Sequence, residues 1–161
     1  MLLLKEDFVK FGKVFTSMPN SFSCRLFLDA SKSTNARCYD YIKKFLASNE
    51  IVSKVGILYH KKYPTIEAFF NYLISQKKQR EFFSKYIDMK VITLLFKSAP
   101  PIESKRDLLK LCKNKVVSTM FSELRRLQAL NLITMSPEGE NIKLNFATFE
   151  DWMLDFAKRC S

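Results

Sequence analysis

Residues 122–133 constrain the fold of this chain more than any other stretch. Leu124, Leu127 and Leu130 recur every three residues, which predicts a helix with one apolar face against a core. Asn131 comes next, and asparagine tolerates the left-handed backbone conformation that ends many helices. An apolar pair follows at once and starts a strand. The stretch therefore predicts a helix that stops at Asn131 and leads directly into a sheet.

The residues on either side predict the rest of a small domain. Residues 132–135 and 142–146 form the strands of a hairpin around a turn at 136–141. Before the helix, residues 88–98 show helical spacing, and the prolines at 100 and 101 end that element. Ser104 suits the N-cap of a second helix over 105–112. The predicted turn is at 113–114, and the third helix begins at residue 115.

Three helices followed by a hairpin resemble the winged-helix family of helix-turn-helix domains. The resemblance implies a third helix that enters the major groove of DNA and a hairpin, the wing, that follows the phosphate backbone. Tandem winged helices also mediate protein contacts in chromosome-segregation, membrane-sorting and polymerase complexes. The fold therefore does not decide the function.

The first half of the chain repeats this order at an offset of 82 residues. A repeat of this length indicates a duplicated domain rather than a solenoid unit. The alternative is chance similarity between amphipathic helices, but the match runs almost without gaps from a proline through a helix end to the next helix start. The matched pairs include Pro19 and Pro101, Asn49 and Asn131, Ile51 and Ile133 and, at an offset of 83, Thr65 and Thr148.

We therefore predict a mainly α protein with small β-hairpins, built as two winged-helix domains in tandem. The first covers residues 1–80 and includes a linking helix, and the second covers residues 81–161 and ends in a C-terminal helix. In the first domain the expected helices span residues 4–17, 21–30, 34–48 and 66–79, the strands span 51–53 and 57–59, and the C-terminal helix of the second domain spans 148–159.

The net charge of +11 indicates a polyanionic partner, with nucleic acid first and an anionic membrane surface second. The charge is uneven, because residues 1–80 hold fourteen basic and six acidic side chains, whereas residues 81–161 hold thirteen and ten. No apolar run approaches the roughly 20 residues of a membrane span. The first half is thus the stronger candidate for DNA.

Catalytic motifs are missing from the sequence. It contains no phosphate-binding glycine loop, no H-E-x-x-H and no nucleophile elbow. His60 is the single histidine, and the four cysteines form no C-x-x-C pair, so we expect free thiols in a reducing compartment. The acidic residues after the apolar start argue against a signal peptide. We expect a cytoplasmic protein, nucleoid-associated in a prokaryote, that is not an enzyme and uses no cofactor or metal.

Candidate DNA-binding residues cluster at the start of each third helix and on the first wing. Arginine and asparagine can read guanine and adenine, while lysine, serine and threonine suit phosphates. For Lys43 and Lys44, an ordinary solvated helix face is an equally good interpretation. The set is Lys32, Ser33, Thr34, Asn35, Arg37, Lys43, Lys44, Lys54, His60, Lys61 and Lys62 in the first half, and Lys113, Asn114, Lys115, Ser118, Arg125 and Arg126 in the second.

The two wings differ in charge, which leaves two functions open. Glu138 and Glu140 on the second wing would repel phosphate. The second domain then either docks on DNA by its helix alone or binds protein, including a second copy of the chain. The first hypothesis is a double-stranded DNA-binding protein, either a transcriptional regulator or a plasmid or virus replication initiator. The alternative is an adaptor for protein–protein contacts.

Overall fold

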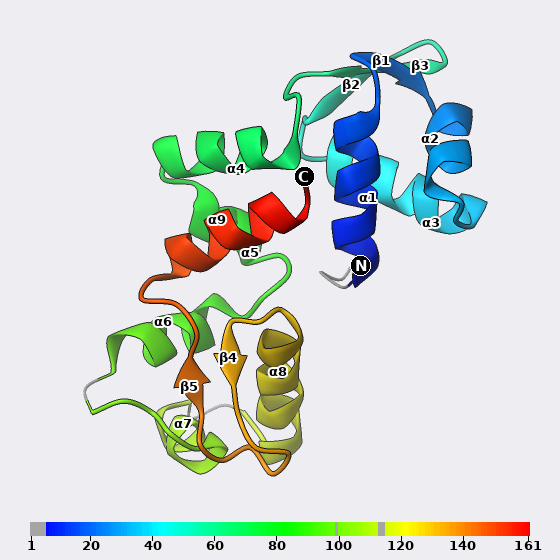
Figure 1. The fold of residues 1–161 in the computed structure, drawn as a ribbon. Helices are drawn as coiled ribbons and strands as arrows, with labels where there is room; N and C mark the ends of the chain where they lie inside the picture. The colour runs from blue at the N-terminus through cyan, green and yellow to red at the C-terminus, as the bar shows by residue number, and fades with distance from the viewer. Residues whose placement is uncertain (1–5, 99, 113–114) are drawn as a thin grey trace. The chain divides into compact units, whose positions relative to one another are not determined.

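The computed structural model describes residues 6–98, 100–112 and 115–161, and these are mainly helical with two small antiparallel sheets (Figure 1). The chain divides into two compact units. Unit 1 comprises Met1–Lys77 and Leu154–Ser161, and unit 2 comprises Lys78–Met153. Among the described residues, no helix has the length and apolar character needed to cross a membrane.

Unit 1 contains a helical N-terminal part, a three-stranded sheet and a closing helix. Its third helix starts as an α-helix and continues as a π-helix, labelled η1. In chain order the elements are α1 (Glu6–Ser17), β1 (Ser21–Ser23), α2 (Cys24–Ser31), α3 (Asn35–Asp40), η1 (Tyr41–Ala47), β2 (Val52–Val55), β3 (Leu58–Lys61) and α4 (Ile66–Ser75).

Strand β1 corrects the prediction of a helix from residue 21. The sheet order is β1-β3-β2, and Phe22 lies opposite Tyr59 in the register. Ser23 is the N-cap of α2, and its hydroxyl accepts a hydrogen bond from the Leu26 N–H at 3.1 Å. Helical hydrogen bonding therefore starts only after Ser23. A strand of three residues is too short for its alternating pattern to stand out in the sequence.

The third helix of unit 1 contains one residue more than its counterpart in unit 2. It runs from the N-cap Thr34 to Glu50, which has φ 58°, whereas the other runs from Val116 to Asn131, with φ 64°. The π-helical stretch accommodates the additional residue. Glu50 therefore occupies the left-handed position, and the predicted pairing of Asn49 with Asn131 is one residue out of register.

The predicted linking helix over 66–79 ends at residue 75, and a separate short helix follows it. Helix α4 ends at Ser75, Lys77 is left-handed with φ 56°, and α5 starts at Gln79. Residues 75–79 are all polar, so no apolar side chain holds a further turn of α4 against the core. The sequence shows this polar run, but the apolar residues on both sides of it have helical spacing, so the prediction continued the helix through it.

Unit 2 follows the predicted order closely. Ser104 accepts from the Asp107 N–H at 3.1 Å as the predicted N-cap, and Asn131 has the predicted left-handed conformation. Both strands are shorter than predicted, and the predicted turn at 113–114 lies outside the described residues. The elements are α5 (Gln79–Phe83), α6 (Met89–Lys97), α7 (Lys105–Leu111), α8 (Val117–Ala129), β4 (Ile133–Thr134), β5 (Lys143–Leu144) and the first part of α9 (Phe149–Arg159).

Aromatic side chains fill the core of each unit. In unit 1 the rings of Phe8 and Phe45 meet edge to face with centroids 4.6 Å apart, and Phe8 also stacks on Phe156 of α9 at 5.6 Å. In unit 2 the buried Trp152 donates its indole N–H to the Leu130 carbonyl at 2.8 Å. This bond anchors α9 on the end of α8 and satisfies a carbonyl that the helix leaves open.

A close helix approach in unit 1 gives a stability prediction. A Cβ atom on Gly12 would lie 2.6 Å from the Cys160 carbonyl oxygen. Alanine is favoured over glycine in a helix by ~1 kcal/mol. We nevertheless expect Gly12→Ala to lower the unfolding free energy by about 1–3 kcal/mol, because the backbone of α1 or of the end of α9 must move to relieve the contact. Urea denaturation measures it. A variant as stable as the parent would show that α1 and the end of α9 are not packed this closely.

Candidate nucleic-acid interface

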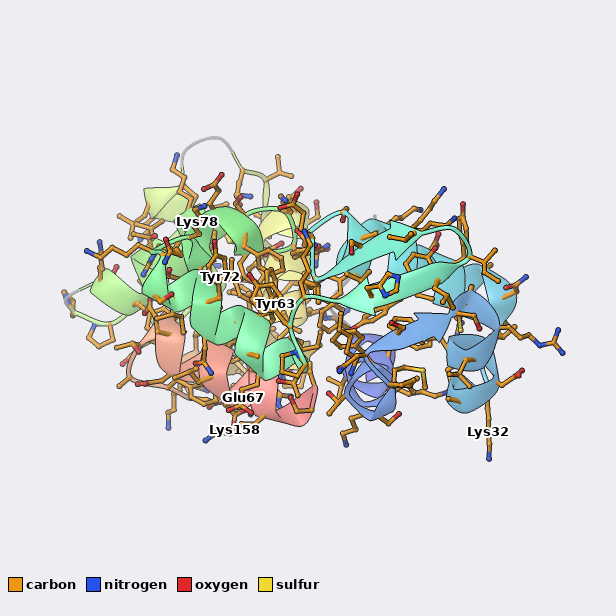
Figure 2. The ribbon with its side chains drawn as sticks, turned by 90° about the horizontal axis from the view of Figure 1, so that it is seen from above. Lys32, Tyr63, Glu67, Tyr72, Lys78 and Lys158 are labelled. Atoms are coloured by element: carbon orange, nitrogen blue, oxygen red, sulfur yellow. The ribbon has the colours of Figure 1, made fainter. Side chains whose placement is uncertain are left out.

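The predicted polar residues of unit 1 lie in and after the turn between α2 and α3, where two helix caps fix the backbone conformation. Lys32 is left-handed with φ 52°, and its N–H closes α2 by bonding the Leu28 carbonyl. Thr34 caps α3 by accepting from the Arg37 N–H at 3.3 Å. The side chains of Asn35 and Arg37 are exposed in the first turn of α3, and Lys32 extends away from the ribbon (Figure 2). Three of the predicted residues are therefore exposed around the start of the third helix.

Ser33 and the lysines of η1 have more local roles. The Ser33 N–H donates to the Ser31 hydroxyl at 3.3 Å. The Lys43 ammonium lies 5.0 Å from the centre of the Tyr39 ring, and a hydrogen bond with Tyr39 raises the pKa of Lys43. Lys44 pairs with Asp40 at 3.3 Å on an exposed helix face. Lys44 thus has the geometry of an ordinary i,i+4 surface pair, which contributes little.

Lys61 and Lys62 are neighbours on the wing with different environments. The Lys61 ammonium donates to the Pro64 carbonyl at 3.1 Å and lies 4.5 Å from the centre of the Phe15 ring. Burial lowers the pKa of Lys61. Lys62 is exposed. The charge that the wing presents outward therefore comes from Lys62, while Lys61 anchors the end of β3 to the body of unit 1.

The other wing residues also take definite positions. The Lys54 ammonium lies 5.7 Å from the centre of the Tyr59 ring. His60 is on β3, and its Nδ1 is 2.7 Å from the Ser21 hydroxyl on β1. Tyr63 packs against Tyr72 of α4, with ring centroids 5.5 Å apart (Figure 2). His60 and Tyr63 thus serve contacts inside unit 1.

The tip of the wing carries an apolar side chain that sequence reasoning assigned only to a strand. Val55 and Leu58 are opposite each other, so Gly56 and Ile57 form a two-residue turn. Gly56 has φ 63°, as the first position of a type II′ turn requires. Ile57 is 82% exposed. The sequence did contain a signal for this position. The two strands are separated by only two residues, and the first of them is glycine, so the second, Ile57, must lie at the tip.

The third helix of unit 2 starts at Val117, two residues after the predicted start, and cationic residues on it and just before it are held by partners inside that unit. Lys115 pairs closely with Asp88, and Arg126 lies 3.5 Å from Glu123. The Arg125 guanidinium lies 4.7 Å from the centre of the Phe121 ring. Ser118 is exposed in the first turn of α8. Lys113 and Asn114 lie outside the described residues.

Asp88 links the start of α6 to α8 and to the residues just before α8. Asp88 caps α6 by accepting from the Lys90 and Val91 N–H groups, and its own N–H donates to Glu123 of α8 at 3.1 Å. Burial alone would raise the pKa of Asp88, but hydrogen bonds from Lys115 and the backbone outweigh it and lower the pKa. The hydrogen bond from Lys115 to Asp88 raises the pKa of Lys115. The pair therefore stabilises the fold of unit 2.

No group of three or more histidine, cysteine, aspartate or glutamate side chains in the described part of the chain could hold a metal ion. Comparison of the chain with protein-family models, curated proteins and solved structures finds no match. The functional argument therefore depends on the geometry and charge described above.

The two wing lysines give a matched pair of stability variants. We expect Lys61→Ala to lower the unfolding free energy by about 1–2 kcal/mol, because it removes buried stem packing and an ammonium hydrogen bond. Lys62→Ala should change it by less than about 0.5 kcal/mol, as surface substitutions usually do. Thermal unfolding of the two variants decides this, and equal melting temperatures would contradict the different placements.

The Asp88 pair gives a pH-dependent prediction. Because the folded-state pKa of Asp88 is lowered, its contribution is complete above the ordinary carboxyl pKa near 4 and is lost as pH falls through the folded value. Asp88→Asn should therefore destabilise at pH 7, and the difference from the parent should shrink below about pH 4. Denaturant titrations across this range measure it, with the exposed Asp107→Asn as the control. A pH-independent difference would exclude this ionic role.

Proposed function

We propose that the chain is a double-stranded DNA-binding protein that recognises DNA through unit 1. The observation that carries the proposal is that Lys32, Asn35 and Arg37 are all exposed at the start of the third helix. Unit 1 holds fourteen basic and seven acidic residues, against thirteen and nine in unit 2. A surplus of positive charge attracts the phosphate backbone and speeds association.

The order of elements supports a winged-helix arrangement in each unit. In both units three helices lead to a left-handed residue, an antiparallel hairpin and a further helix, and unit 2 has the short α5 in addition before its three. The N-caps Ser23 and Ser104 precede the second helices, and Thr65 and Thr148 each accept a hydrogen bond at the start of the last helix. These matched contacts favour two winged-helix domains that arose by duplication.

Each residue of unit 1 has a proposed role in this complex. Arg37 and Asn35 suit hydrogen bonds with guanine and adenine edges in the major groove. Lys32 suits phosphates on one side of the helix, and Lys62 suits them on the wing. Ile57 at the wing tip is of the type that minor-groove proteins insert between base steps. The scheme provides sequence recognition without a catalytic group.

A sequence-specific DNA-binding protein of this kind would act as a transcriptional regulator or a replication initiator. A second candidate function, an adaptor, is favoured by unit 2 alone. There the basic side chains Lys115 and Arg126 are paired with carboxylates, and Glu138 and Glu140 are exposed around the hairpin turn. The acidic hairpin turn of unit 2 is therefore less suited to phosphate than the wing of unit 1, where Lys62 is exposed.

Salt-titrated binding to a duplex selected from a random pool, and to a scrambled duplex, tests the proposal. Lys62→Ala should weaken binding to both duplexes alike and lower the salt slope by roughly one unit. Arg37→Ala should reduce the preference for the selected duplex by about 1–3 kcal/mol. Both effects follow from the different contacts, one to phosphate and one to a base edge.

The matched control is Arg125→Ala, an exposed arginine on the third helix of unit 2. It should retain the parental affinity, salt slope and sequence preference. If Arg125→Ala abolishes binding while the unit 1 variants bind like the parent, recognition belongs to unit 2. If the parent protein binds neither duplex at low salt, the DNA-binding function is wrong.

A further inference from the structure

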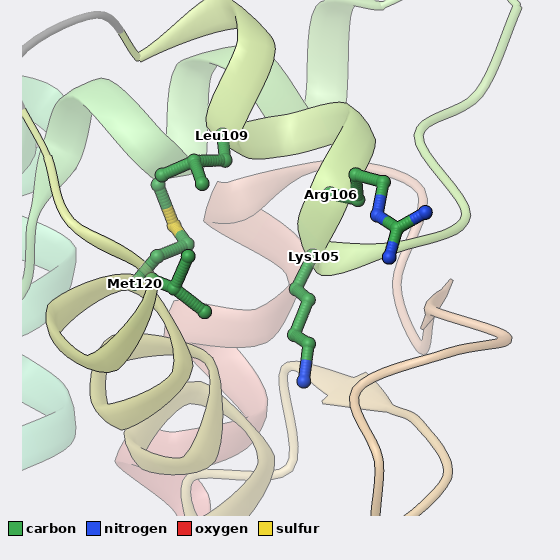
Figure 3. Close-up of a pocket in the computed structure, with 5 residues that line it drawn as sticks. Lys105, Arg106, Leu109 and Met120 are labelled. Atoms are coloured by element: carbon green, nitrogen blue, oxygen red, sulfur yellow. The ribbon is translucent and has the colours of Figure 1, made fainter.

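A small pocket lies between α7 and α8 within unit 2 (Figure 3). Its volume is about 170 Å³, and it is lined by Lys105, Arg106, Leu109, Val117 and Met120. Leu109 and Met120 are on the side where the two helices meet, and Lys105 and Arg106 extend from α7 (Figure 3). The pocket therefore combines an apolar floor with two cationic side chains.

Exposed apolar side chains at the start of α8 adjoin the pocket. Val117 lines the pocket and is 53% exposed, and Val116, the N-cap residue before it, is 63% exposed. In unit 1 the corresponding N-cap and first helical positions hold the polar Thr34 and Asn35. Exposed apolar residues at a pocket are typical of a protein interaction site.

The positive charge at the pocket is available to a ligand. In the part of the chain that the structure describes, no carboxylate forms an ion pair with Lys105 or Arg106. The Lys105 ammonium lies 4.7 Å from the centre of the Phe121 ring, and Arg106 is exposed. Lys110 adds an exposed cation on the next turn of α7. A partner with carboxylates would complement this edge.

The size of the pocket limits the occupant. Sites for drug-sized ligands and cofactors usually enclose about 300–1,000 Å³, so this pocket is too small for one of them. It can hold one aliphatic or aromatic side chain, which is how the central anchor of a protein interface is usually bound. The exposed Val116 and Val117 then provide area for the residues around that anchor.

We propose that the α7–α8 surface of unit 2 binds a partner-protein segment with one large apolar anchor flanked by acidic residues. The anchor fills the pocket against Leu109, Val117 and Met120, and the flanking carboxylates pair with Arg106 and Lys105. This function is separate from DNA recognition by unit 1 and does not depend on it. The chain would then join a DNA site to a second protein.

The test uses the full chain and peptides selected from a displayed library with a central Leu or Phe between Asp and Glu residues. A fluorescein-labelled copy of the tightest peptide is titrated with the parent and with variants. We expect Val117→Asp and Arg106→Glu each to weaken its binding about tenfold or more, as loss of an interface hot spot does. The control Lys143→Glu, an exposed lysine on β5, should bind the peptide like the parent.

Two readouts separate the alternatives. Circular dichroism and thermal melts must show that Val117→Asp is folded, and Arg106→Glu provides an independent exposed substitution. If no selected peptide loses affinity with these variants, the proposal is wrong. It is also overturned if sedimentation shows that the chain self-associates and that Val117→Asp abolishes this, since the occupant is then a second copy. Duplex binding by the same variants should remain at the parental level.

Discussion

The left-handed residue at the end of each third helix is the constraint on which both proposed surfaces depend. After Glu50, the Ile51 N–H donates to the Leu46 carbonyl at 2.8 Å, and after Asn131, the Leu132 N–H donates to the Leu127 carbonyl at 3.0 Å. The bond closes the helix and turns the chain directly into the hairpin. The positions of helix and wing are therefore coupled within each unit. Asparagine adopts this conformation at little cost, whereas glutamate requires support from the surrounding core.

The additional residue in the third helix of unit 1 shows how that core is maintained. A residue inserted into an α-helix would rotate every later side chain away from its place. The π-helical turn absorbs the insertion instead. Tyr41, Ile42, Phe45 and Leu46 consequently all remain buried, and Ile51 still enters the hairpin from the core. The helix start, where Asn35 and Arg37 are exposed, is left unchanged by this adjustment.

The two units have a similar order of elements but expose different side chains. At the start of the third helix, unit 1 presents Asn35 and Arg37, whereas unit 2 presents Val117 beside an apolar pocket. On the body of unit 2, Asp88 and Glu123 engage Lys115 and Arg126, so these cations stabilise the unit. Charge counts taken from the sequence treat paired and exposed cations alike. The structure identifies paired cations in both units, for example Lys44 with Asp40 in unit 1 and Lys115 with Asp88 in unit 2.

The sequence by itself determined some of the helix ends and the mainly α composition with small hairpins, because caps and apolar periodicity are local properties. Ser104 and Asn131 are examples, since each acts within a few residues of its own position. Only the tertiary structure decided that Phe22 belongs to a strand and that Lys61 is held at Pro64 while Lys62 is exposed. Strand pairing, burial and ion pairs join residues far apart in the chain, and neither spacing nor composition specifies which of them meet.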